Sequence, residues 1–520
     1  MTPEQFAEYS AQGFNHIPVT EEVLADLDTP LSSYIKAADG PYSYLLESAS
    51  QGGEKWSRYS MVGLPAKKIL KVFAYQVVIE EGGVEIDRFD VEDPLSFVES
   101  FQGEYRYPLI DDLPIYTGGL VGYFGYDTVR YVEGKIKNSQ PRDTIGTPDI
   151  LLMVSNDVMV FDSVRGKIHL ITHANPNDID ALKNARLRLK EMKLGLQAQI
   201  PDKVRQSTMG PAIHEEDFVS SYGEDQFKKD VDRIKDYIVE GDVMQVVLSQ
   251  RMSVTLEADP LSIYRSLRSL NPSPYMYYMN LGDFRIVSSS PEILARLDYG
   301  QVTVRPLAGT RRRGRDEKED KELEAELLAD PKERAEHLML IDLGRNDIGR
   351  VCETGSVIVD EMMIVERYAH VMHIASNVEG KLKPGLSAMD LLRATLPVGT
   401  LSGAPKVRAM EIIDELEPEK RGIFGGAVGY LSWNGNMDTA IAIRTAVIKE
   451  GKLYVQAGAG VVADSVPELE WKETINKARS IFRAAEMAEN GLRLQGVEEN
   501  PRQSNIDEER DVVGQKETIK

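Results

Sequence analysis

Three consecutive segments near the end of the chain constrain its fold most strongly. Residues 424–433, 440–450 and 452–460 are each short, rich in apolar and β-branched residues, and bounded by turn residues, which is the pattern of β-strands. Elsewhere, helical patterns are interspersed with further strand patterns, without a strict alternation of the two. We therefore predict an α+β (mixed α/β) fold with large antiparallel sheets rather than a regular β-α-β arrangement.

The stretch 454–477 combines glycines with acidic residues. We expect its strand to break at a turn, 458–460, where backbone N–H groups can approach an anion because glycine has no side chain in the way. The next residues predict a helix on which Glu470 and Glu473, three positions apart, point to one face. These features predict a site for a negatively charged substrate held with a cation. The alternative is an ordinary turn followed by a solvated helix.

A second pair of glutamates repeats this spacing. Glu333 and Glu336 lie in a segment with a helical pattern, so two helices would each present two carboxylates. Such an all-oxygen set suits Mg²⁺ or Mn²⁺ better than Zn²⁺. Glutamate pairs of this kind also occur on solvated helix surfaces, and that alternative stays open.

The histidines give a weaker signal. His370 and His373 have no cysteine or third histidine arranged near them, and the HExxH pattern is absent, so zinc is not indicated. One of them could act as an acid or base, or it could be a structural histidine. Neither 399–406 nor 458–463 has the glycine spacing of a nucleotide-binding loop.

Composition excludes several classes of partner. The net charge of −22 and the isoelectric point near 4.9 argue against a nucleic acid or an anionic membrane surface. Cys352 is the only cysteine, so an internal disulfide is impossible and a reducing compartment is expected. The polar N-terminus lacks a secretory pattern, and no apolar run approaches the roughly 18 residues of a membrane helix. We expect a soluble, cytoplasmic protein.

Composition also divides the chain. Residues 201–216 are polar and contain Pro and Gly, which predicts a linker between an N-terminal region, 15–200, and a C-terminal region, 217–490. The tail, 491–520, is polar and charged, and we expect it to be poorly ordered. Within the N-terminal region, 69–80 predicts a single strand.

Several sequence blocks carry a family resemblance. In chain order they are PLAGTRRRG at 306–314, DPKERAEHLMLIDLGRND at 330–347, HVMH at 370–373, GTLSGAPKVRAMEIIDELE at 399–417, GGAVGY, DTAIAIRTA and QAGAGVVADSVPELEWKET. Together they span most of 225–485 and resemble the chorismate-utilising enzymes. The resemblance implies a sandwich of two large antiparallel β-sheets flanked by helices, with 217–490 as the chorismate-binding catalytic region.

The resemblance also implies a Mg²⁺ site. Glu336 and Glu473 would be the ligands, and Glu333 and Glu470 would support them directly or through water. The metal would hold the ring carboxylate of chorismate and so offset the repulsion between this carboxylate and an acidic protein.

Further residues are implied around the substrate. Arg444 would bind the enolpyruvyl carboxylate bidentately, and Glu292 would be the general acid that protonates the departing C4 hydroxyl. His373 would move the C2 proton, with Thr400 beside the ring and Lys477 near the substrate carboxylate. The other lining positions are Gly309, Thr310, Gly458, Ala459, Gly460 and Phe424, the last standing where the family usually has a tyrosine that donates to the substrate.

Two positions bear on the reaction. Family members that add water carry a lysine where this chain has Gln245, and the sibling that makes 4-amino-4-deoxychorismate carries a nucleophilic lysine where this chain has Ala308. The resemblance therefore implies a lyase that adds ammonia to chorismate at C2, loses the C4 hydroxyl and eliminates pyruvate to give anthranilate, the first step of tryptophan biosynthesis. The alternatives are a 4-amino-4-deoxychorismate synthase component I and a non-catalytic tryptophan-sensing subunit.

A feedback site for L-tryptophan is implied by two segments, one from each half of the chain. LLESAS with RYS resembles one half of such a site, and NPSPYMYYM resembles the other. The implied contacts are Glu47, Ser48, Ser60, Asn271, Pro274, Tyr275 and Met276. The lone cysteine provides no glutaminase, so ammonia must come from solution or from a separate glutamine amidotransferase subunit. The resemblance implies the latter, in a heterotetramer of two synthase and two amidotransferase subunits.

Overall fold

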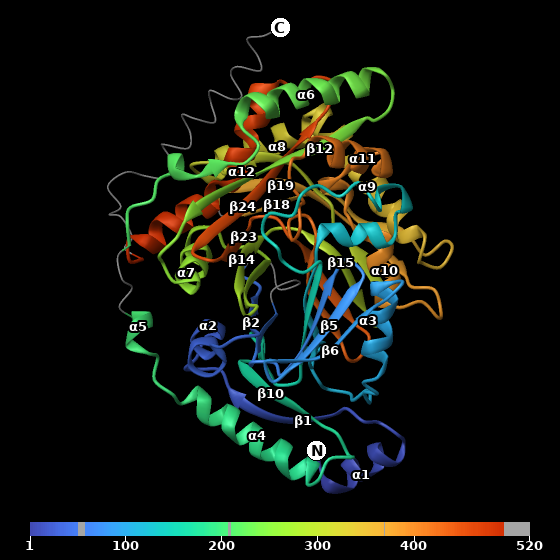
Figure 1. Ribbon diagram of the computed structural model, residues 1–520, viewed down its shortest axis with the longest axis vertical. Coiled ribbons are helices and arrows are strands. Elements are labelled where there is room, and N and C mark those ends of the chain that lie inside the picture. Colours follow the sequence, from blue (N-terminus) through green and yellow to red (C-terminus); the bar gives the residue numbers. More distant parts are fainter. Residues whose placement is uncertain (50–57, 206–209, 369, 493–520) are drawn as a thin grey trace.

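The computed structural model describes residues 1–49, 58–205, 210–368 and 370–492. In this part of the chain, two sheets of 12 strands form the body of the molecule, and helices cover them from outside (Figure 1). All pairings between the named strands are antiparallel, so the predicted mixed α/β fold with two large antiparallel sheets is confirmed. None of the described helices is both long and apolar enough to cross a membrane.

The first sheet has, from one edge to the other, the strands β1 (Ile17–Leu24), β10 (Lys167–Ala174), β9 (Val158–Asp162), β3 (Tyr59–Gly63), β2 (Ser43–Glu47), β13 (Tyr275–Asn280), β14 (Phe284–Ser290), β23 (Thr445–Lys449), β24 (Lys452–Val461), β12 (Gln245–Thr255) and β11 (Val219–Ser220), with β20 (Gly403–Ala404) beside β12.

The second sheet runs through β17 (Leu307–Arg312), β19 (Val371–Lys381), β16 (Gln301–Val304), β15 (Ile293–Asp298), β22 (Met437–Ile441), β21 (Ala427–Ser432), β7 (Gly119–Phe124), β8 (Ile150–Ser155), β4 (Lys68–Phe73), β5 (Gln76–Glu81) and β6 (Val84–Asp90), with β18 (Ile358–Arg367) beside β19.

The helices are α1 (Pro3–Ala11), α2 (Pro30–Ser33), α3 (Pro94–Gly103), α4 (Ala181–Leu196), α5 (Asp202–Arg205), α6 (Glu224–Val239), α7 (Pro260–Leu270), α8 (Glu317–Ala329), α9 (Pro331–Gly349), α10 (Ala388–Thr395), α11 (Lys406–Leu416) and α12 (Pro467–Glu489).

Both sheets contain strands from both halves of the chain. In the first sheet β2 pairs with β13, and in the second β7 pairs with β21. The segment 201–216 therefore joins two halves that share their sheets, and within it 206–209 lie outside the described residues. The division into 15–200, 201–216 and 217–490 stays a prediction, and most of the tail, 493–520, also lies outside the described residues.

The core has three layers because neighbouring residues of a strand point to opposite faces. Tyr44 and Leu45 of β2 illustrate this: Tyr44 enters the core between the sheets, and Leu45 enters the core under the outer helices. Helices α4, α7 and α12 pack on the first sheet, and α3, α9 and α10 pack on the second.

Two of the predicted strands are wrong. Residues 69–80 form the hairpin β4–β5, which turns at Ala74, a residue with a left-handed φ of 51°. Residues 440–450 do not form one strand: β22 ends at Ile441 in the second sheet, and β23 begins at Thr445 in the first. The apolar run continues through this break because the crossover between the sheets is itself buried, so the pattern could not reveal it.

A second crossover lies beside the first. The chain leaves β14 in the first sheet at Ser290 and enters β15 in the second sheet at Ile293. The amide of Ile441 donates to the carbonyl oxygen of Glu292 (3.0 Å), and the hydroxyl of Ser290 donates to the carbonyl oxygen of Ile441 (2.7 Å). These two hydrogen bonds hold the two crossovers together.

Candidate active site

Glu292 occupies one crossover and is buried. Burial raises the pKa of its carboxyl group to about 8, although a backbone hydrogen bond from Leu307, the hydroxyl of Thr400 and the charges of Lys477 and Arg444 oppose this shift. The Thr400 hydroxyl donates to Oε1 of Glu292 at 3.5 Å. At neutral pH the carboxyl group therefore holds a proton, as a general acid must. Both residues border a pocket of about 410 Å³.

Arg444 occupies the other crossover. Its backbone has a left-handed φ of 50°, and its carbonyl oxygen accepts a hydrogen bond from the amide of Ser289 (3.2 Å). Burial lowers the pKa of its guanidinium to about 10, and the carboxylates of Glu473 and Glu292 oppose that shift. Arg444 therefore remains a cation at neutral pH, within the electrostatic reach of both glutamates.

His373 lies on β19, opposite Thr310 of β17. Its Nδ1 lies 2.9 Å from the carbonyl oxygen of Gly309 and 3.1 Å from Oγ1 of Thr310. Because a carbonyl oxygen only accepts, Nδ1 carries the proton and Nε2 keeps a lone pair. Burial lowers the pKa of His373 to about 4, so the ring is a neutral base at physiological pH.

Two further side chains of this region are those of His370 and Tyr368. Nε2 of His370 lies 2.9 Å from the carbonyl oxygen of Leu270, which gives that ring a structural partner. The ring of Tyr368 packs edge-on against His373, with the ring centroids 5.5 Å apart. Tyr368 was missed by sequence reasoning, because only the strand pairing brings it back onto His373.

The predicted glycine turn at 458–460 is wrong, because β24 continues to Val461. Gly458 lies opposite Ser249 of β12, Ala459 opposite Leu248 and Gly460 opposite Val247. A Cβ atom on Gly458 would come within 3.0 Å of Val247, and one on Gly460 within 2.6 Å of Nε2 of Gln245. The glycines are thus needed for close packing against β12.

One edge of this strand is open towards the site. In the described residues β23 pairs with β24 only as far as Val455, so the edge of 456–461 that faces away from β12 has no strand partner. Lys477 reaches this edge from α12, and its Nζ donates to the carbonyl oxygen of Gly458 at 2.9 Å. The backbone edge and the Lys477 ammonium therefore lie together, and the anion site stays a prediction.

Both predicted glutamate pairs lie on helices: Glu333 and Glu336 on α9, and Glu470 and Glu473 on α12. Burial raises the pKa of Glu333, although Arg311, 3.3 Å away, opposes this, and Glu336 adds to it. Glu473 pairs with Lys477 at 2.8 Å.

These carboxylates are not gathered at one point. Among the described residues no three His, Cys, Asp or Glu side chains lie close enough to hold a metal ion. A divalent cation would have to displace the ion pairs that Glu333 and Glu473 make with Arg311 and Lys477. The assignment of these glutamates as metal ligands stays a prediction.

The two segments of the predicted tryptophan site do meet. Glu47 of β2 lies opposite Met276 of β13, and the amide of Ala49 donates to the carbonyl oxygen of Ser273 (3.0 Å). Two residues that sequence reasoning missed, Tyr264 and Arg268 of α7, donate to the Glu47 carboxylate, Arg268 at 3.0 and 3.2 Å. Their helical spacing gave no hint of this partner.

The other residues predicted for the tryptophan site lie near the place where β2 pairs with β13. The Ser48 hydroxyl is buried and has no hydrogen-bond partner among the described residues. The Tyr275 hydroxyl donates to Asp438 (3.0 Å), and the Asn271 amide donates to Ser289 (3.2 Å). Pro274 directly precedes β13, and Ser60 is buried on β3 beside β2. Their roles stay predictions.

Comparison with known proteins gives this geometry a family. The family model described as chorismate binding enzyme matches residues 45–483, which is most of the chain. The chain belongs to the chorismate-binding enzyme family.

Individual relatives and solved structures support this family assignment. A curated anthranilate synthase component 1 from Pseudomonas aeruginosa is 58% identical over 492 residues, which cover 95% of this chain and 100% of that protein. The crystal structure of anthranilate synthase component I from Streptococcus pneumoniae superimposes with a TM-score of 0.74 at 39% identity, covering 89% of this chain and 99% of that one. A menaquinone-specific isochorismate synthase from Escherichia coli shares the fold, with a TM-score of 0.67 at 20% identity, over 93% of this chain and 98% of that one.

One position of the family pattern is changed in this chain. Phe424 is buried at 8% exposure, and the guanidinium of Arg421 lies 5.6 Å from the centre of its ring. It also borders a second pocket, of about 430 Å³, together with Thr445 and Tyr454. The phenyl ring keeps the packing of the position but brings no hydroxyl donor to the site.

Proposed function

We propose that the chain is the ammonia-using synthase component of anthranilate synthase, a lyase that converts chorismate and ammonia into anthranilate and pyruvate. The observation that carries this proposal is the buried carboxyl group of Glu292, with its raised pKa, within electrostatic reach of the guanidinium of Arg444, on two crossovers joined by a hydrogen bond. A proton donor next to a carboxylate-binding cation suits the removal of a hydroxyl group from a substrate with two carboxylates.

Binding uses two cations and a backbone edge. Arg444 binds the enolpyruvyl carboxylate through its planar fork of donors, and Lys477 lies near the other carboxylate, held by Glu473 and Gly458. The open edge of β24 at Gly458–Gly460, with Gly309 and Thr310 across the site, lines the ring. These local charges let a chain with a net charge of −22 hold an anion.

Glu292 acts in the first step. Ammonia forms a bond to C2, the two ring double bonds C1=C2 and C5=C6 move to C1=C6 and C4=C5, and the C4–O bond breaks as Glu292 gives its proton to the departing oxygen, so that water leaves. The new ammonium group at C2 then loses a proton to solvent. Thr400, hydrogen-bonded to Glu292, holds the carboxyl group towards the ring. The burial that raises the pKa of Glu292 to about 8 keeps this proton available at neutral pH.

His373 acts in the second step. Its unprotonated Nε2 removes the C2 proton, the electrons of that bond complete the aromatic ring, and the C3–O bond breaks, releasing enolpyruvate that takes a proton to become pyruvate. The Gly309 carbonyl oxygen fixes the tautomer by accepting from Nδ1. Gln245 offers no base to activate water, and Ala308 offers no nucleophile, which favours direct amination.

Mg²⁺ is part of the proposal. The candidate ligands are all carboxylates, which suit this ion: Glu336 and Glu473, supported by Glu333 and Glu470. When bound, the ion would neutralise the ring carboxylate of chorismate.

We also infer a second subunit and a feedback inhibitor. The relatives are named component 1, which implies another component for them; for this chain we infer a glutamine amidotransferase in a two-plus-two heterotetramer. L-tryptophan would bind where β2 pairs with β13, and there the Ser48 hydroxyl has no hydrogen-bond partner within the described residues. A cytoplasmic location is inferred from the single cysteine.

One assay tests the activity. The purified chain is incubated with chorismate, Mg²⁺ and ammonium at mildly alkaline pH, and fluorescence of anthranilate is followed. Anthranilate supports the proposal. Formation of 4-amino-4-deoxychorismate would support the sibling enzyme instead, and the absence of any reaction would support a tryptophan sensor.

A further inference from the structure

Arg421 is a buried cation that the reaction scheme above does not use. Its exposure is 3%, and it lies three residues before Phe424. Its Nε and Nη2 donate to the two carboxylate oxygens of Glu417 at 2.8 and 2.6 Å. Nη1 donates to the carbonyl oxygen of Leu401 (2.6 Å), and Nη2 also donates to the carbonyl oxygen of Val247 (2.7 Å). Every nitrogen of the guanidinium therefore has an acceptor.

The two backbone acceptors, the carbonyl oxygens of Leu401 and Val247, lie on different elements that border the proposed site. Leu401 follows Thr400, the residue whose hydroxyl donates to Glu292. Val247 lies on β12, opposite Gly460 of β24. Arg421 thus joins the Thr400 turn to the strand pair that presents the glycine edge.

Other bonds already tie the end of this turn to β12. The amide of Val247 donates to the carbonyl oxygen of Ser402 (2.9 Å), and the amide of Met244 donates to that of Ala404 (2.7 Å). Leu401, the last residue of the turn (Gly399–Leu401), is connected to β12 through a side chain. That side chain is Arg421.

Glu417, the ion-pair partner of Arg421, contacts a second residue of β12, Ser249. Its Oε1 accepts from the amide and the hydroxyl of Ser249, at 2.8 and 2.7 Å. Ser249 lies opposite Gly458, whose carbonyl oxygen accepts from Lys477. The Glu417–Arg421 pair therefore contacts the backbone behind both glycines and beside Thr400.

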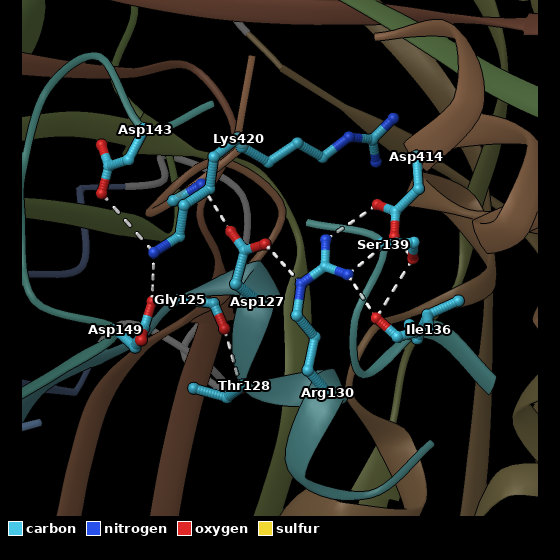
Figure 2. A network of polar contacts seen from close by, with 12 residues as sticks. Gly125, Asp127, Thr128, Arg130, Ile136, Ser139, Asp143, Asp149, Asp414 and Lys420 are labelled. Atoms are coloured by element: carbon cyan, nitrogen blue, oxygen red, sulfur yellow. Dashed lines mark hydrogen bonds and ion pairs between the residues drawn. The ribbon is translucent and has the colours of Figure 1, made fainter. Parts of the chain in front are cut away.

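The chain on either side of Arg421 is also held firmly. Lys420 donates to Asp149 at 2.5 Å and lies 3.6 Å from Asp143, and the amide of Gly422 donates to Asp127 at 2.9 Å. Figure 2 shows Lys420 between Asp143 and Asp149 in this network. Arg421 is thereby fixed from the N-terminal half of the chain.

We propose that Arg421 is a positioning residue for the reaction: it sets Thr400, and through it Glu292, at the correct place relative to the glycine edge of β24. This inference rests on the proposed function. A guanidinium can donate in several directions within one plane, whereas an ammonium on a flexible stem cannot reach Glu417, Leu401 and Val247 together. Arg421 faces the ring of Phe424, which has no hydrogen-bonding group, and its hydrogen bonds go to Glu417, Leu401 and Val247, so its effect is on the geometry of the acid.

The test compares Arg421→Lys with Arg130→Lys. Arg130 is a matched control, because it is also buried (6% exposed) and forms a two-pronged ion pair, with Asp414 at 2.6 and 2.8 Å. Figure 2 shows it between Asp127 and Asp414, where its remaining contact is the carbonyl oxygen of Ile136. Asp127 also accepts from the amide of Gly422, so Arg130→Lys loosens one support of the segment around Arg421 but leaves the bonds of Arg421 to Glu417, Leu401 and Val247 in place.

For each variant, kcat and the chorismate KM are measured with ammonia as nitrogen source, together with Tm and the pH profile of kcat. We expect Arg421→Lys to lower kcat about 10- to 100-fold, as displaced catalytic groups do, with KM changed less than about threefold. In the Arg421→Lys variant, the fall of kcat at alkaline pH should move to higher pH, because Glu292 loses the hydrogen bond from Thr400 that lowers its pKa. Arg130→Lys should keep kcat within about twofold and leave the pH profile unchanged.

A folded Arg421→Lys variant whose kcat and pH profile match those of Arg130→Lys would overturn the proposal. If Arg421→Lys does not fold, Glu417→Gln replaces it: the amide keeps the shape but weakens the hold on Arg421, and a folded Glu417→Gln with unchanged kcat would equally overturn it. A wild-type chain that forms no anthranilate would instead refute the proposed function.

Discussion

The backbone amide of Ile441 donates a 3.0 Å hydrogen bond to the carbonyl oxygen of Glu292, and this bond joins the two places where the chain crosses between its sheets. Arg444 lies three residues beyond Ile441, on the same crossover. The proton donor and the carboxylate-binding cation of the proposed reaction therefore stand on adjoining segments that both sheets hold in place. This arrangement suits groups that must keep their relative position throughout a reaction.

The first prediction concerns Glu292 and pH. Burial raises the pKa of its carboxyl group to about 8, and the protonated form is the active one, so kcat should be constant between about pH 4, the pKa of His373, and about pH 8, and fall as the pH rises through 8. Glu292→Gln keeps the shape but has no acidic proton, and we expect kcat to fall about 10²- to 10⁴-fold. The profile is measured at a constant, saturating concentration of free NH₃. A wild-type kcat that still rises above pH 9 would contradict the role of Glu292.

Much of the fold was predictable from local patterns. The consecutive strands β21, β23 and β24 and the acidic helix α12 follow directly from apolar spacing and turn residues. What the patterns could not show is which sheet each strand joins. The apolar run 440–448 is interrupted only by Arg444 and Thr445, yet the chain changes sheets there, because a largely buried crossover resembles a buried strand in composition.

From the sequence, candidate site residues could be named, but their arrangement in space could not be predicted. Glu47 and Met276 were expected to meet, and their strands do pair. The glycine segment 458–460 was expected to turn, but glycine serves there to admit the side chains of Val247 and Gln245. Arg268 was missed because its ion pair with Glu47 joins residues far apart in the sequence, and Arg421 was missed because its backbone acceptors, Leu401 and Val247, also lie far from it in the sequence.

The second prediction concerns the metal. Glu473→Gln should abolish anthranilate formation and also the rise in Tm that Mg²⁺ produces in the wild-type chain, because a ligand that binds only the folded state stabilises it. The control is Glu468→Gln on the same helix, whose carboxylate is 60% exposed and lies 3.8 Å from Lys228. This control should keep both the activity and the Mg²⁺-dependent shift. A Glu473→Gln variant with wild-type turnover would exclude Glu473 as a ligand.

The third prediction concerns feedback by L-tryptophan. The buried hydroxyl of Ser48 lacks a partner in the described part of the chain, so an amino acid bound at the β2–β13 seam could pair with it. Ser48→Ala should raise the tryptophan concentration for half-inhibition about tenfold, which corresponds to about 1.4 kcal/mol, and leave kcat unchanged. Ser480→Ala removes another buried, unpaired hydroxyl, on α12, and should leave inhibition as it is. Equal inhibition of both variants would place the effector elsewhere.

The fourth prediction concerns Phe424. Restoring a hydroxyl donor with Phe424→Tyr should strengthen chorismate binding by about 1.5–3 kcal/mol, the usual contribution of a hydrogen bond to a charged group, and so lower KM at least tenfold. Phe424 borders the second pocket, together with Thr445 and Tyr454. Phe89→Tyr, on β6 of the second sheet, is the control and should not change KM. An unchanged KM in a stable Phe424→Tyr variant would show that this chain already has a replacement donor.

The most direct test of the central claim is the identity and ratio of the products. The purified chain is given chorismate, Mg²⁺ and ¹⁵N-labelled ammonium, and the products are identified by NMR. We expect labelled anthranilate and pyruvate to appear in equal amounts, with the label on the ring amino group. Labelled 4-amino-4-deoxychorismate without pyruvate, or unlabelled isochorismate, would contradict the assignment of Glu292, His373 and Arg444 to ammonia-dependent anthranilate synthesis.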